Sequence, residues 1–240
     1  MPDRAALITG ASRGIGFAIA EALGADGYKL TLTARKPATL EEAAAELSGK
    51  GYEVQQLAAN LNDEDGIKAV VDAHREAYGR LDVLVNNGGV GIGAAADEHQ
   101  TKYIDMQLDV NVRAMILLYR ETLDMLKAAG AEHGSAQVVN LASIAGKNPQ
   151  PWLSVYSATK AAVVAYTVAM NKELNGEGIK SVALCPGFVD TDMTEFAKGS
   201  VAPEEMIQPQ DLANAVRFVL GLSKAVVIPE IIFQRPGETL

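Results

Sequence analysis

A glycine-rich turn between an apolar strand and an apolar helix constrains the fold of this chain more than any other feature. The strand-like run is Ala5–Thr9 and the helical pattern is Phe17–Leu23, with Gly10, Gly14 and Gly16 between them. A short continuous apolar run predicts a strand buried on both faces, as parallel sheets require. Gly10 permits the tight turn, Gly14 lets a pyrophosphate approach the backbone, and Gly16 lets the helix pack closely on the strand. The free N–H groups at the helix start would face the phosphates, so the unit predicts dinucleotide binding; a plain strand-to-helix turn is the alternative.

The end of the second predicted strand bears on the choice of dinucleotide. This strand spans residues 28–34, and Arg35 follows it directly. A carboxylate at this position would bind the ribose 2′-hydroxyl of NAD and repel the 2′-phosphate of NADP. Two guanidiniums, from Arg35 and from Arg13 in the first loop, can instead pair with a dianionic phosphate. The sequence therefore favours NADP(H), and two solvated arginines are the alternative.

The rest of the chain alternates between strand-like and helix-like segments. Further strands are predicted at residues 52–57, 81–85, 137–142, 179–184 and, interrupted by Pro229-Glu230, 226–233. Helices are predicted at residues 39–50, 64–78 (with Asp63 as N-cap), 103–129, 154–174 and 209–220. This alternation predicts an α/β fold with a doubly wound parallel sheet. With no repeat, low-complexity tract or linker, residues 1–240 are predicted to form a single domain.

Composition excludes several classes of function. The formal net charge of -9 argues against nucleic acid or a membrane surface as partner. The single cysteine, Cys185, excludes an intrachain disulfide and a cysteine-based metal site. His74, His99 and His133 lack ligand spacing, so we expect no metal and place these histidines at the surface or in loops. No apolar stretch reaches the roughly 18 residues of a membrane span, and the N-terminus lacks an apolar signal core, so a cytoplasmic location is expected.

Tyr156 and Lys160 form the candidate proton-donating pair. They are four residues apart on a predicted helix and therefore share one face, where the ammonium would lower the pKa of the phenol. Ser143 follows a predicted strand, at the carboxyl end where ligands bind in open α/β sheets. Asn111 lies inside a predicted helix, which marks either a tolerated surface position or a local distortion with a purpose. Taken alone, the Tyr–Lys pair also fits a solvated helix face.

Three loops and one helix complete the expected surroundings of the site. Residues 86–89 are small and could let a cofactor lie against the backbone, residues 91–96 are expected to be mobile, and residues 193–208 are expected to form a lid. The helix at 154–174 carries small and apolar residues nearly all round, which predicts burial on more than one side. We therefore expect a homodimer or homotetramer formed through the helices around residues 103–129 and 154–174.

In combination, these motifs resemble the classical short-chain dehydrogenase/reductase family over essentially the whole chain. The resemblance rests on Thr9-Gly10-x-x-x-Gly14-x-Gly16, Asn86-Asn87-Gly88-Gly89, Asn111, Ser143, Tyr156-x-x-x-Lys160 and Pro186-Gly187, all in family order. Each motif is modest alone, whereas their joint occurrence is very specific. The resemblance implies a Rossmann-like, seven-stranded parallel sheet with helices on both faces.

The resemblance also implies roles for individual residues. Tyr156 would protonate a carbonyl oxygen or deprotonate an alcohol, and Ser143 would polarise the carbonyl. Lys160 would lower the Tyr156 pKa and hold the nicotinamide ribose, while Asn111 would bend its helix and hold a water that relays protons to Lys160. Contacts with NADP(H) are implied for Gly10, Ser12, Arg13, Gly14, Ile15, Gly16, Arg35, Asn60, Leu61, Asn87, Gly88, Gly89, Tyr156, Lys160, Pro186, Gly187, Val189 and Thr191.

The chain departs from the family pattern at three places. Gly88 stands where the family usually has alanine, which should loosen the loop, and Asn60 replaces a commoner aspartate beside the adenine. Residues 9–16 and 186–194 look most like the 3-oxoacyl-thioester reductases. The tail at residues 228–236 is unlike their glycine-rich C-terminus, which weakens any inference about acyl-carrier protein.

The sequence thus predicts an NADP(H)-dependent oxidoreductase that interconverts a ketone and a secondary alcohol. A 3-oxoacyl thioester is the first candidate substrate. Arg113, Lys147 and Lys198 are candidates for a basic patch that would meet its phosphates, and solvated surface charges are the alternative. A xenobiotic, steroid-like or sugar-derived carbonyl is the alternative, and the expected pocket holds the apolar residues Trp152, Phe188, Met193 and Phe196. An NADPH-binding sensor without turnover is disfavoured, because a binder needs no proton relay. A serine hydrolase is disfavoured because Ser143 lies outside a Gly-x-Ser-x-Gly elbow.

Overall fold

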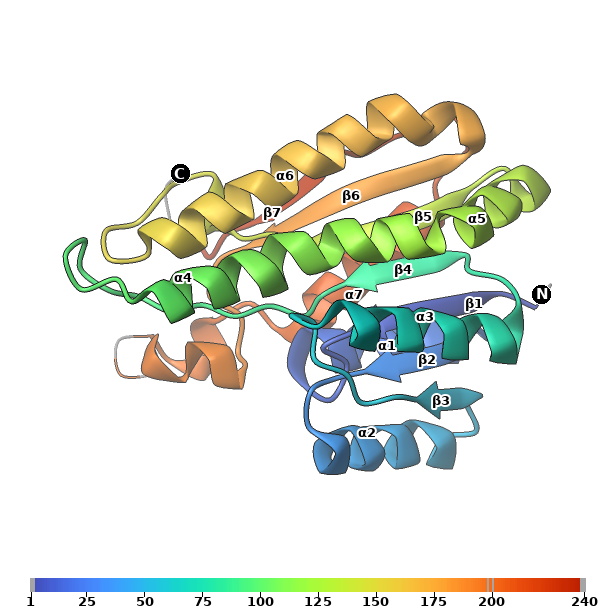
Figure 1. Ribbon diagram of the computed structural model, residues 1–240, viewed down its shortest axis with the longest axis horizontal. Coiled ribbons are helices and arrows are strands. Elements are labelled where there is room, and N and C mark those ends of the chain that lie inside the picture. Colours follow the sequence, from blue (N-terminus) through green and yellow to red (C-terminus); the bar gives the residue numbers. More distant parts are fainter. Residues whose placement is uncertain (1–2, 198, 200, 238–240) are drawn as a thin grey trace.

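Seven parallel strands form one sheet in the computed structural model, which describes residues 3–197, 199 and 201–237 (Figure 1). Their order across the sheet is β3-β2-β1-β4-β5-β6-β7. The strands are β1 (Ala5–Thr9), β2 (Lys29–Thr33), β3 (Val54–Gln56), β4 (Val83–Asn86), β5 (Ala136–Leu141), β6 (Ile179–Pro186) and β7 (Glu230–Phe233). The chain winds outward from β1 to β3 and in the other direction from β4 to β7. The predicted doubly wound sheet is confirmed, and its direction reverses between β1 and β4, where such folds bind ligands.

Helices cover both faces of the sheet (Figure 1). One face carries α1 (Gly14–Ala25), α2 (Pro37–Gly49) and α7 (Pro209–Leu220). The other carries α3 (Glu64–Tyr78), α5 (Ala114–His133) and α6 (Ser154–Leu174). The helix α4 (Thr101–Leu108) leads into α5 and lies toward the carboxyl ends of the strands.

Alternate residues of each central strand enter two separate cores. In β1, Ile8 packs in the core that contains Ile19 of α1, whereas Leu7 packs in the core that contains Ile67 of α3 and Leu118 of α5. All five of these side chains are buried. A strand with a core on each side needs apolar residues in both directions, which explains the continuous apolar runs in the sequence.

Several predicted elements differ from the observed ones. The single helix expected at residues 103–129 is α4, a π-helical turn at Asp109–Arg113 and α5. The last strand begins only at Glu230, because Pro229 has no N–H to donate to a strand ladder. The third strand shrinks to three residues at the sheet edge. By contrast, α3, α6 and α7 begin and end at the predicted residues, and Asp63 caps α3 by accepting from the Asp65 backbone N–H.

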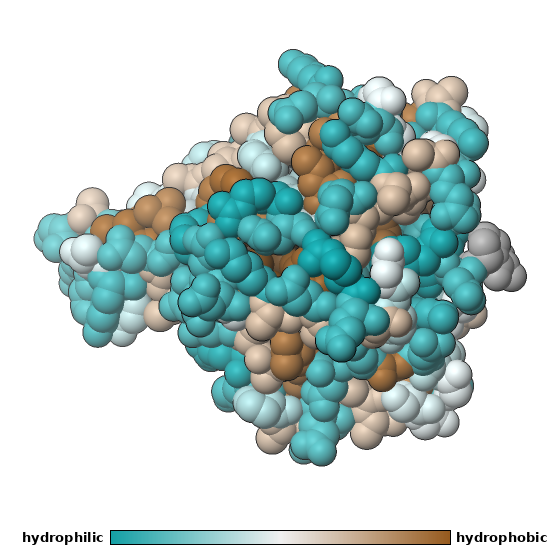
Figure 2. Space-filling view, turned by 45° about the vertical axis from the view of Figure 1, so that its right-hand side comes forward, coloured by the Kyte–Doolittle hydropathy of each residue, from teal (hydrophilic) through white to brown (hydrophobic). Residues whose placement is uncertain are grey.

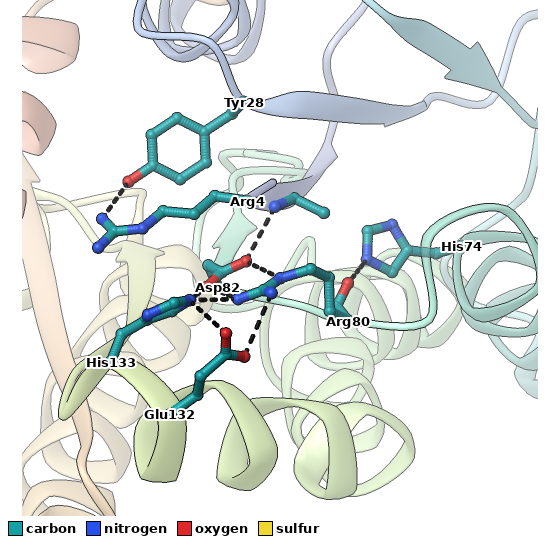
Figure 3. Close-up of polar contacts among 8 residues, drawn as sticks. Arg4, Tyr28, His74, Arg80, Asp82, Glu132 and His133 are labelled. Carbon is teal, nitrogen blue, oxygen red and sulfur yellow. Dashed lines mark hydrogen bonds and ion pairs between the residues drawn. The ribbon is translucent and has the colours of Figure 1, made fainter. Parts of the chain in front are cut away.

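A cluster of polar side chains lies at the amino ends of the central strands (Figure 3). It is therefore at the opposite end of the sheet from Ser143, which follows the carboxyl end of β5. Arg80 donates to both oxygens of the buried Asp82 carboxylate, at 2.8 and 2.9 Å. Asp82 also accepts from the backbone N–H of Ala5 at 2.9 Å. From the end of α5, Glu132 and His133 lie 3.2 and 2.6 Å from the Arg80 guanidinium. The cluster therefore joins the starts of β1 and β4 to the end of α5.

The expectation that all histidines lie at the surface or in loops is wrong. His74 is fully buried on α3, with Nδ1 2.7 Å from Thr31 Oγ1 and Nε2 2.8 Å from the Arg80 carbonyl oxygen. His133 ends α5, and its side chain is only 12% exposed beside the polar cluster. His99 does lie in a loop, where its Nε2 contacts Ser154 Oγ at 3.0 Å.

Hydrophilic side chains predominate on the face shown in Figure 2, with smaller hydrophobic patches between them. Within the described residues, none of the helices combines the length and the apolar character needed to cross a bilayer.

Candidate active site

The turn after β1 has the geometry that its glycines predict. Gly10 and Gly14 adopt positive φ angles of 64° and 58°. At Gly16, an added side-chain carbon would lie 2.5 Å from the Gly10 carbonyl oxygen and 2.4 Å from Asn87 Nδ2. Only glycine therefore lets α1 start this close to the turn and to Asn87 of the loop after β4.

Thr9 and Asn87 lock this turn to the loop that follows β4. Asn87 Nδ2 donates to the carbonyl oxygens of Thr9 and Gly10, at 2.9 and 3.0 Å. Thr9 Oγ1 in turn accepts from the backbone N–H groups of Asn87 and Gly88, at 3.0 and 2.9 Å. These four bonds bring residues 9–16 and 86–89 together at the point where the sheet reverses direction.

Ser143, Tyr156 and Lys160 come together at the carboxyl ends of β5 and β6. Ser143 is buried directly beyond β5, and its hydroxyl hydrogen-bonds the Tyr156 side chain and donates to the Pro186 carbonyl oxygen at 3.4 Å. Tyr156 and Lys160 share one face of α6, with Lys160 Nζ 5.7 Å from the Tyr156 ring centroid. Lys160 Nζ also donates to the Leu141 carbonyl oxygen at 2.6 Å. The predicted juxtaposition of these side chains is present.

Burial governs the ionisation of the two groups on α6. Burial raises the pKa of Tyr156, and the hydrogen bond with Ser143 opposes that rise. Burial lowers the pKa of Lys160 to about 8. The Tyr156 pKa was expected to be lowered by Lys160, but it is raised instead, because desolvation of the phenol is the largest effect. Tyr156 is accordingly held as a neutral phenol, which is the form that donates a proton.

Asn111 distorts its helix and uses both ends of its side chain. It lies in the π-helical turn, so the second alternative for this residue, a local distortion, is the observed one. Its Oδ1 accepts from the Val90 backbone N–H and its Nδ2 donates to the Val90 carbonyl oxygen, both at 2.8 Å. Nδ2 also donates to Thr159 Oγ1 at 3.0 Å, next to Lys160 on α6. The amide thus ties the loop after β4 to the helix that carries the candidate acid.

The loop at residues 90–94 is held at every second residue. After the Val90 contacts, the backbone N–H of Ile92 donates to Gln107 Oε1 at 3.1 Å, and that of Ala94 donates to the Trp152 carbonyl oxygen at 2.8 Å. At Gly91, an added side-chain carbon would lie 3.4 Å from the Tyr156 ring. The segment was expected to be mobile from its composition, yet it is anchored over the candidate acid.

The two arginines of the predicted 2′-phosphate site lie in different environments. Arg35 is exposed and has no ion pair with any residue that the structure describes. Arg13, at the N-cap of α1, is exposed as well but forms an ion pair with Asp192. Arg35 is therefore available to bind an anion, whereas Arg13 would first have to break its ion pair with Asp192.

The segment that follows β6 crosses in front of the glycine-rich turn. Its base is fixed where Phe188 and Asp190 exchange backbone hydrogen bonds with Ile207, at 3.0 and 2.9 Å. Thr191 packs on Gly14, since an added carbon there would lie 3.1 Å from Thr191 Cγ2. The segment expected as a lid contains two short 3-10 helices, at Asp192–Ala197 and Pro203–Glu205. Through Thr191 and Asp192, the residues just before the expected lid contact the glycine-rich turn predicted to hold the cofactor phosphates.

Comparison with known proteins identifies the family. The profile of the short chain dehydrogenase family matches residues 4–200. An uncharacterized oxidoreductase of Staphylococcus epidermidis is 32% identical over 230 residues, which is 95% of this chain and 96% of that protein. The chain belongs to the short-chain dehydrogenase family. It is accordingly an oxidoreductase, and the resemblance inferred from its motifs is confirmed.

Solved short-chain dehydrogenases share the fold along nearly the whole chain. A metagenomic short-chain oxidoreductase in complex with NADP is 32% identical, with a TM-score of 0.82 and coverage of 95% of this chain and 96% of that one. A variant of actinorhodin polyketide ketoreductase with NADPH is 31% identical, with a TM-score of 0.86 and coverage of 96% and 95%.

Two of the positions at which this short-chain dehydrogenase departs from the family pattern lie near one another. An added carbon at Gly88 would lie 2.4 Å from Leu61 Cδ1, so Leu61 fills the space that an alanine side chain would take. Asn60, which precedes Leu61, is exposed, and its carbonyl oxygen accepts from the Asp63 N–H at 3.0 Å. Within the described part of the chain, no group of three or more His, Cys, Asp or Glu side chains is arranged to hold a metal ion.

Sequence reasoning missed the glycines that bring the site elements into contact. An added carbon at Gly146, just after Ser143, would lie 2.6 Å from the Lys160 carbonyl carbon. One at Gly93 would lie 1.7 Å from the Trp152 ring. Neither glycine has a positive φ, so no turn signal marks them, and only the packed structure shows why a side chain is excluded. The Arg13–Asp192 ion pair, 179 residues apart in the chain, likewise had no local signal.

Proposed function

We propose that this protein is an NADP(H)-dependent reductase that interconverts a ketone and a secondary alcohol. The observation that carries the proposal is the meeting of Ser143, Tyr156 and Lys160 beside the glycine-rich turn, at the carboxyl end of the sheet. A neutral phenol, a second hydroxyl and a buried amine at one point suit proton transfer to a carbonyl oxygen. The NADP and NADPH complexes of the two solved relatives support the choice of cofactor.

The residues present fit a dinucleotide. The α1 N-terminus and the close approach allowed at Gly14 would hold the pyrophosphate, and Arg35 would meet the 2′-phosphate. When bound, NADP(H) supplies or accepts the hydride. The Tyr156 hydroxyl donates its proton to the carbonyl oxygen during reduction, while Ser143 donates a hydrogen bond to that oxygen. Lys160, whose Nζ lies 5.7 Å from the Tyr156 ring centroid, would hold the nicotinamide ribose.

The structure bears on the class of carbonyl substrate. Of the three basic residues proposed to meet the phosphates of a thioester substrate, Arg113 is paired with Glu64 at 2.7 Å and Lys147 with Glu230 at 2.9 Å. The third, Lys198, lies outside the described residues. Because both described cations are already held in ion pairs with carboxylates, the thioester hypothesis loses support and a smaller, apolar carbonyl is the better candidate. The polyketide ketoreductase among the relatives agrees with ketone reduction in general.

We further propose that the protein acts as a homodimer or homotetramer. In the single chain, α6 is buried along one stripe only, so the predicted burial on a second side would need another subunit. Its opposite side exposes four alanines, Ala158, Ala161, Ala165 and Ala169. The neighbouring helices α4 and α5 expose Leu108 and Ile116, which are 46% and 38% exposed. A second copy packed on these helices would remove this apolar surface from water.

The test of the proposed activity is NADPH oxidation with acetoacetyl-CoA and a panel of simple ketones, using the wild type and Tyr156→Phe. Loss of the phenol proton should lower turnover by at least about a hundredfold, while NADPH still binds. Turnover of ketones but not of the thioester would support the smaller carbonyl. Tight NADPH binding with no turnover of any carbonyl would contradict the proposal and favour an NADPH-binding sensor. Equal turnover by Tyr156→Phe would exclude Tyr156 as the acid.

A further inference from the structure

Three aromatic side chains from separate segments pack together at the side of the loop, residues 90–94, that covers Tyr156. Trp152 precedes α6, Phe188 follows β6, and Phe196 belongs to the 3-10 helix Asp192–Ala197. The ring centroids of Trp152 and Phe196 are 6.1 Å apart at 85°, and those of Phe188 and Phe196 are 6.0 Å apart at 83°. Both pairs are therefore edge-to-face. We call these three residues the aromatic wall.

One end of the aromatic wall is joined to the candidate acid by the loop at residues 90–94. The Trp152 ring lies directly on Gly93, where an added carbon would be 1.7 Å from Cε3. Two residues earlier, Gly91 lies against the Tyr156 ring, with a corresponding distance of 3.4 Å. The Ala94 N–H, which donates to the Trp152 carbonyl oxygen at 2.8 Å, fixes the loop to the wall.

The other end of the aromatic wall is joined to Ser143. Phe188 stands two residues after Pro186, and the Pro186 carbonyl oxygen accepts from Ser143 Oγ at 3.4 Å. The backbone N–H of Gly187, between them, donates to Phe233 of β7 at 3.0 Å, which fixes this connection to the sheet. The Arg235 guanidinium lies 5.5 Å from the Phe188 ring centroid. Short backbone segments thus connect the three rings to Tyr156 at one end and to the hydrogen-bond partner of Ser143 at the other.

The aromatic wall is more exposed than its residue types explain. Trp152 is 53% exposed and Phe196 is 62% exposed, and these are large apolar side chains. Trp152 also adopts a φ of 55°, and it is the sole residue other than glycine in the described structure with a positive φ. A bulky residue in that region is strained, and such strain persists where the surroundings hold it, often at ligand sites. Exposed aromatic surface, with one ring on a strained backbone and short segments leading to Ser143 and Tyr156, indicates a ligand surface.

We propose that the aromatic wall binds a flat aromatic group next to the carbonyl, so that the substrates are aryl or polycyclic ketones and their alcohols. The inference rests on the proposed ketone reduction at Ser143 and Tyr156. A ring that joins Trp152 and Phe196 would continue their edge-to-face arrangement and gain specific contact energy beyond the area it buries. A flexible acyl chain would gain only the free energy of burying its apolar surface.

Trp152 is the only tryptophan in the chain, so its fluorescence reports directly on the aromatic wall. The full-length protein is titrated in the presence of NADP⁺, which prevents ketone reduction, with acetophenone and with 2-octanone, an aliphatic ketone of equal carbon number. Saturable quenching is expected for acetophenone, with half-saturation about tenfold higher in Phe196→Ala. Phe218→Ala, at an exposed phenylalanine of α7, should not change the titration. Linear quenching without saturation, equal in all three proteins, would overturn the proposal.

Steady-state NADPH oxidation with the same two ketones separates this proposal from the proposed activity. The wild type should prefer acetophenone, and Phe196→Ala should reduce its kcat/KM about tenfold while changing that of 2-octanone less than about threefold. Equal loss on both ketones, or a preference for 2-octanone, would overturn the aromatic specificity and leave the reductase activity standing. Saturable acetophenone binding at Trp152 with no oxidation of NADPH by either ketone would support the aromatic wall and contradict the reductase.

Discussion

Arg35 stands exposed at the end of β2, and the choice between the two nicotinamide dinucleotides depends on its charge. Replacing Arg35 with Asp should weaken NADPH about 10- to 100-fold relative to NADH, because a charge-assisted hydrogen bond is replaced by repulsion of the 2′-phosphate. The measurement is a fluorescence titration with each reduced cofactor. Lys172→Asp, at an exposed position near the end of α6, makes the same change of charge and should leave the ratio unmoved. Unchanged relative affinities in Arg35→Asp would refute the assignment.

His74 makes stability depend on pH. Its Nε2 faces the Arg80 carbonyl oxygen, which only accepts, so Nε2 carries the proton and Nδ1 accepts from the Thr31 hydroxyl. Burial lowers the pKa of His74 from 6.5 to about 4. Above pH 6.5 His74 is neutral in both the folded and the unfolded chain, so its contribution to the free energy of unfolding is fully present. As pH falls from 6.5 toward 4, only the unfolded chain takes up the proton, so the free energy of unfolding falls.

The size of this pH effect can be measured by urea unfolding at pH 7 and pH 5. His74 should account for a loss of about 2 kcal/mol in the free energy of unfolding between these pH values. In His74→Gln the same two measurements should differ by about that much less, because glutamine does not titrate while the acidic side chains remain. Parallel pH profiles for the two proteins would show that His74 is not held neutral in the fold.

At the scale of elements, the approach of α1 to β1 depends on Gly16. In Gly16→Ala the new methyl group would meet the Gly10 carbonyl oxygen, which belongs to the backbone and cannot swing aside. Urea unfolding should show a loss of about 1–3 kcal/mol, the usual cost of overpacking, together with loss of cofactor binding. The matched control is Gly49→Ala at the end of α2, where nothing lies within 4 Å of the new carbon. It should be neutral or stabilising by up to about 1 kcal/mol, and equal effects at both glycines would contradict the packing argument.

Local signals explain which elements were predictable. Residues 64–78 and 209–220 are helices with the predicted ends because Asp63 and Pro209 mark their starts in the sequence. The π-helical turn around Asn111 was foreseen only as one of two alternatives. Its cause, the paired hydrogen bonds to Val90, comes from a loop 21 residues away. The burial of His74 was missed for the same reason, since its partner Thr31 lies on another element.

At the scale of the whole molecule, the sheet reversal gathers the site from distant parts of the chain. The loops after β1, β4, β5 and β6 all begin at the carboxyl ends of parallel strands. The order of motifs in the sequence was therefore enough to predict that these loops lie together. That Tyr156 and Lys160 share one face of α6 could be predicted from their spacing alone. The pKa of Tyr156 was predicted with the wrong sign, because the spacing gives the nearby charge but not the desolvation that outweighs it. Which charges are already paired, such as Arg13 with Asp192, also depends on tertiary contacts that spacing does not reveal.

The exposed alanines of α6 predict how whole molecules associate. Their small side chains present a flat apolar surface on which a helix of a second copy could pack closely, next to the exposed Ile116 of α5. Ala165→Glu would place a charge in the middle of that contact, where it would lose its hydration without gaining a partner. Light scattering after size exclusion should show an oligomer for the wild type and a monomer for this variant.

The matched control for this experiment is Ala45→Glu, which makes the same substitution at an exposed alanine of α2, on the opposite face of the sheet. It should keep the mass of the wild type. A monomeric wild type at micromolar concentration would refute the proposed assembly outright. An oligomer that survives Ala165→Glu but not Ala45→Glu would move the contact to the other face of the sheet. Because Ala158, at one end of the same stripe, lies between Tyr156 and Lys160 in the sequence, assembly through α6 would also hold the candidate acid and its lysine in place. The monomeric variant is therefore expected to have lower turnover than the wild type as well as lower mass.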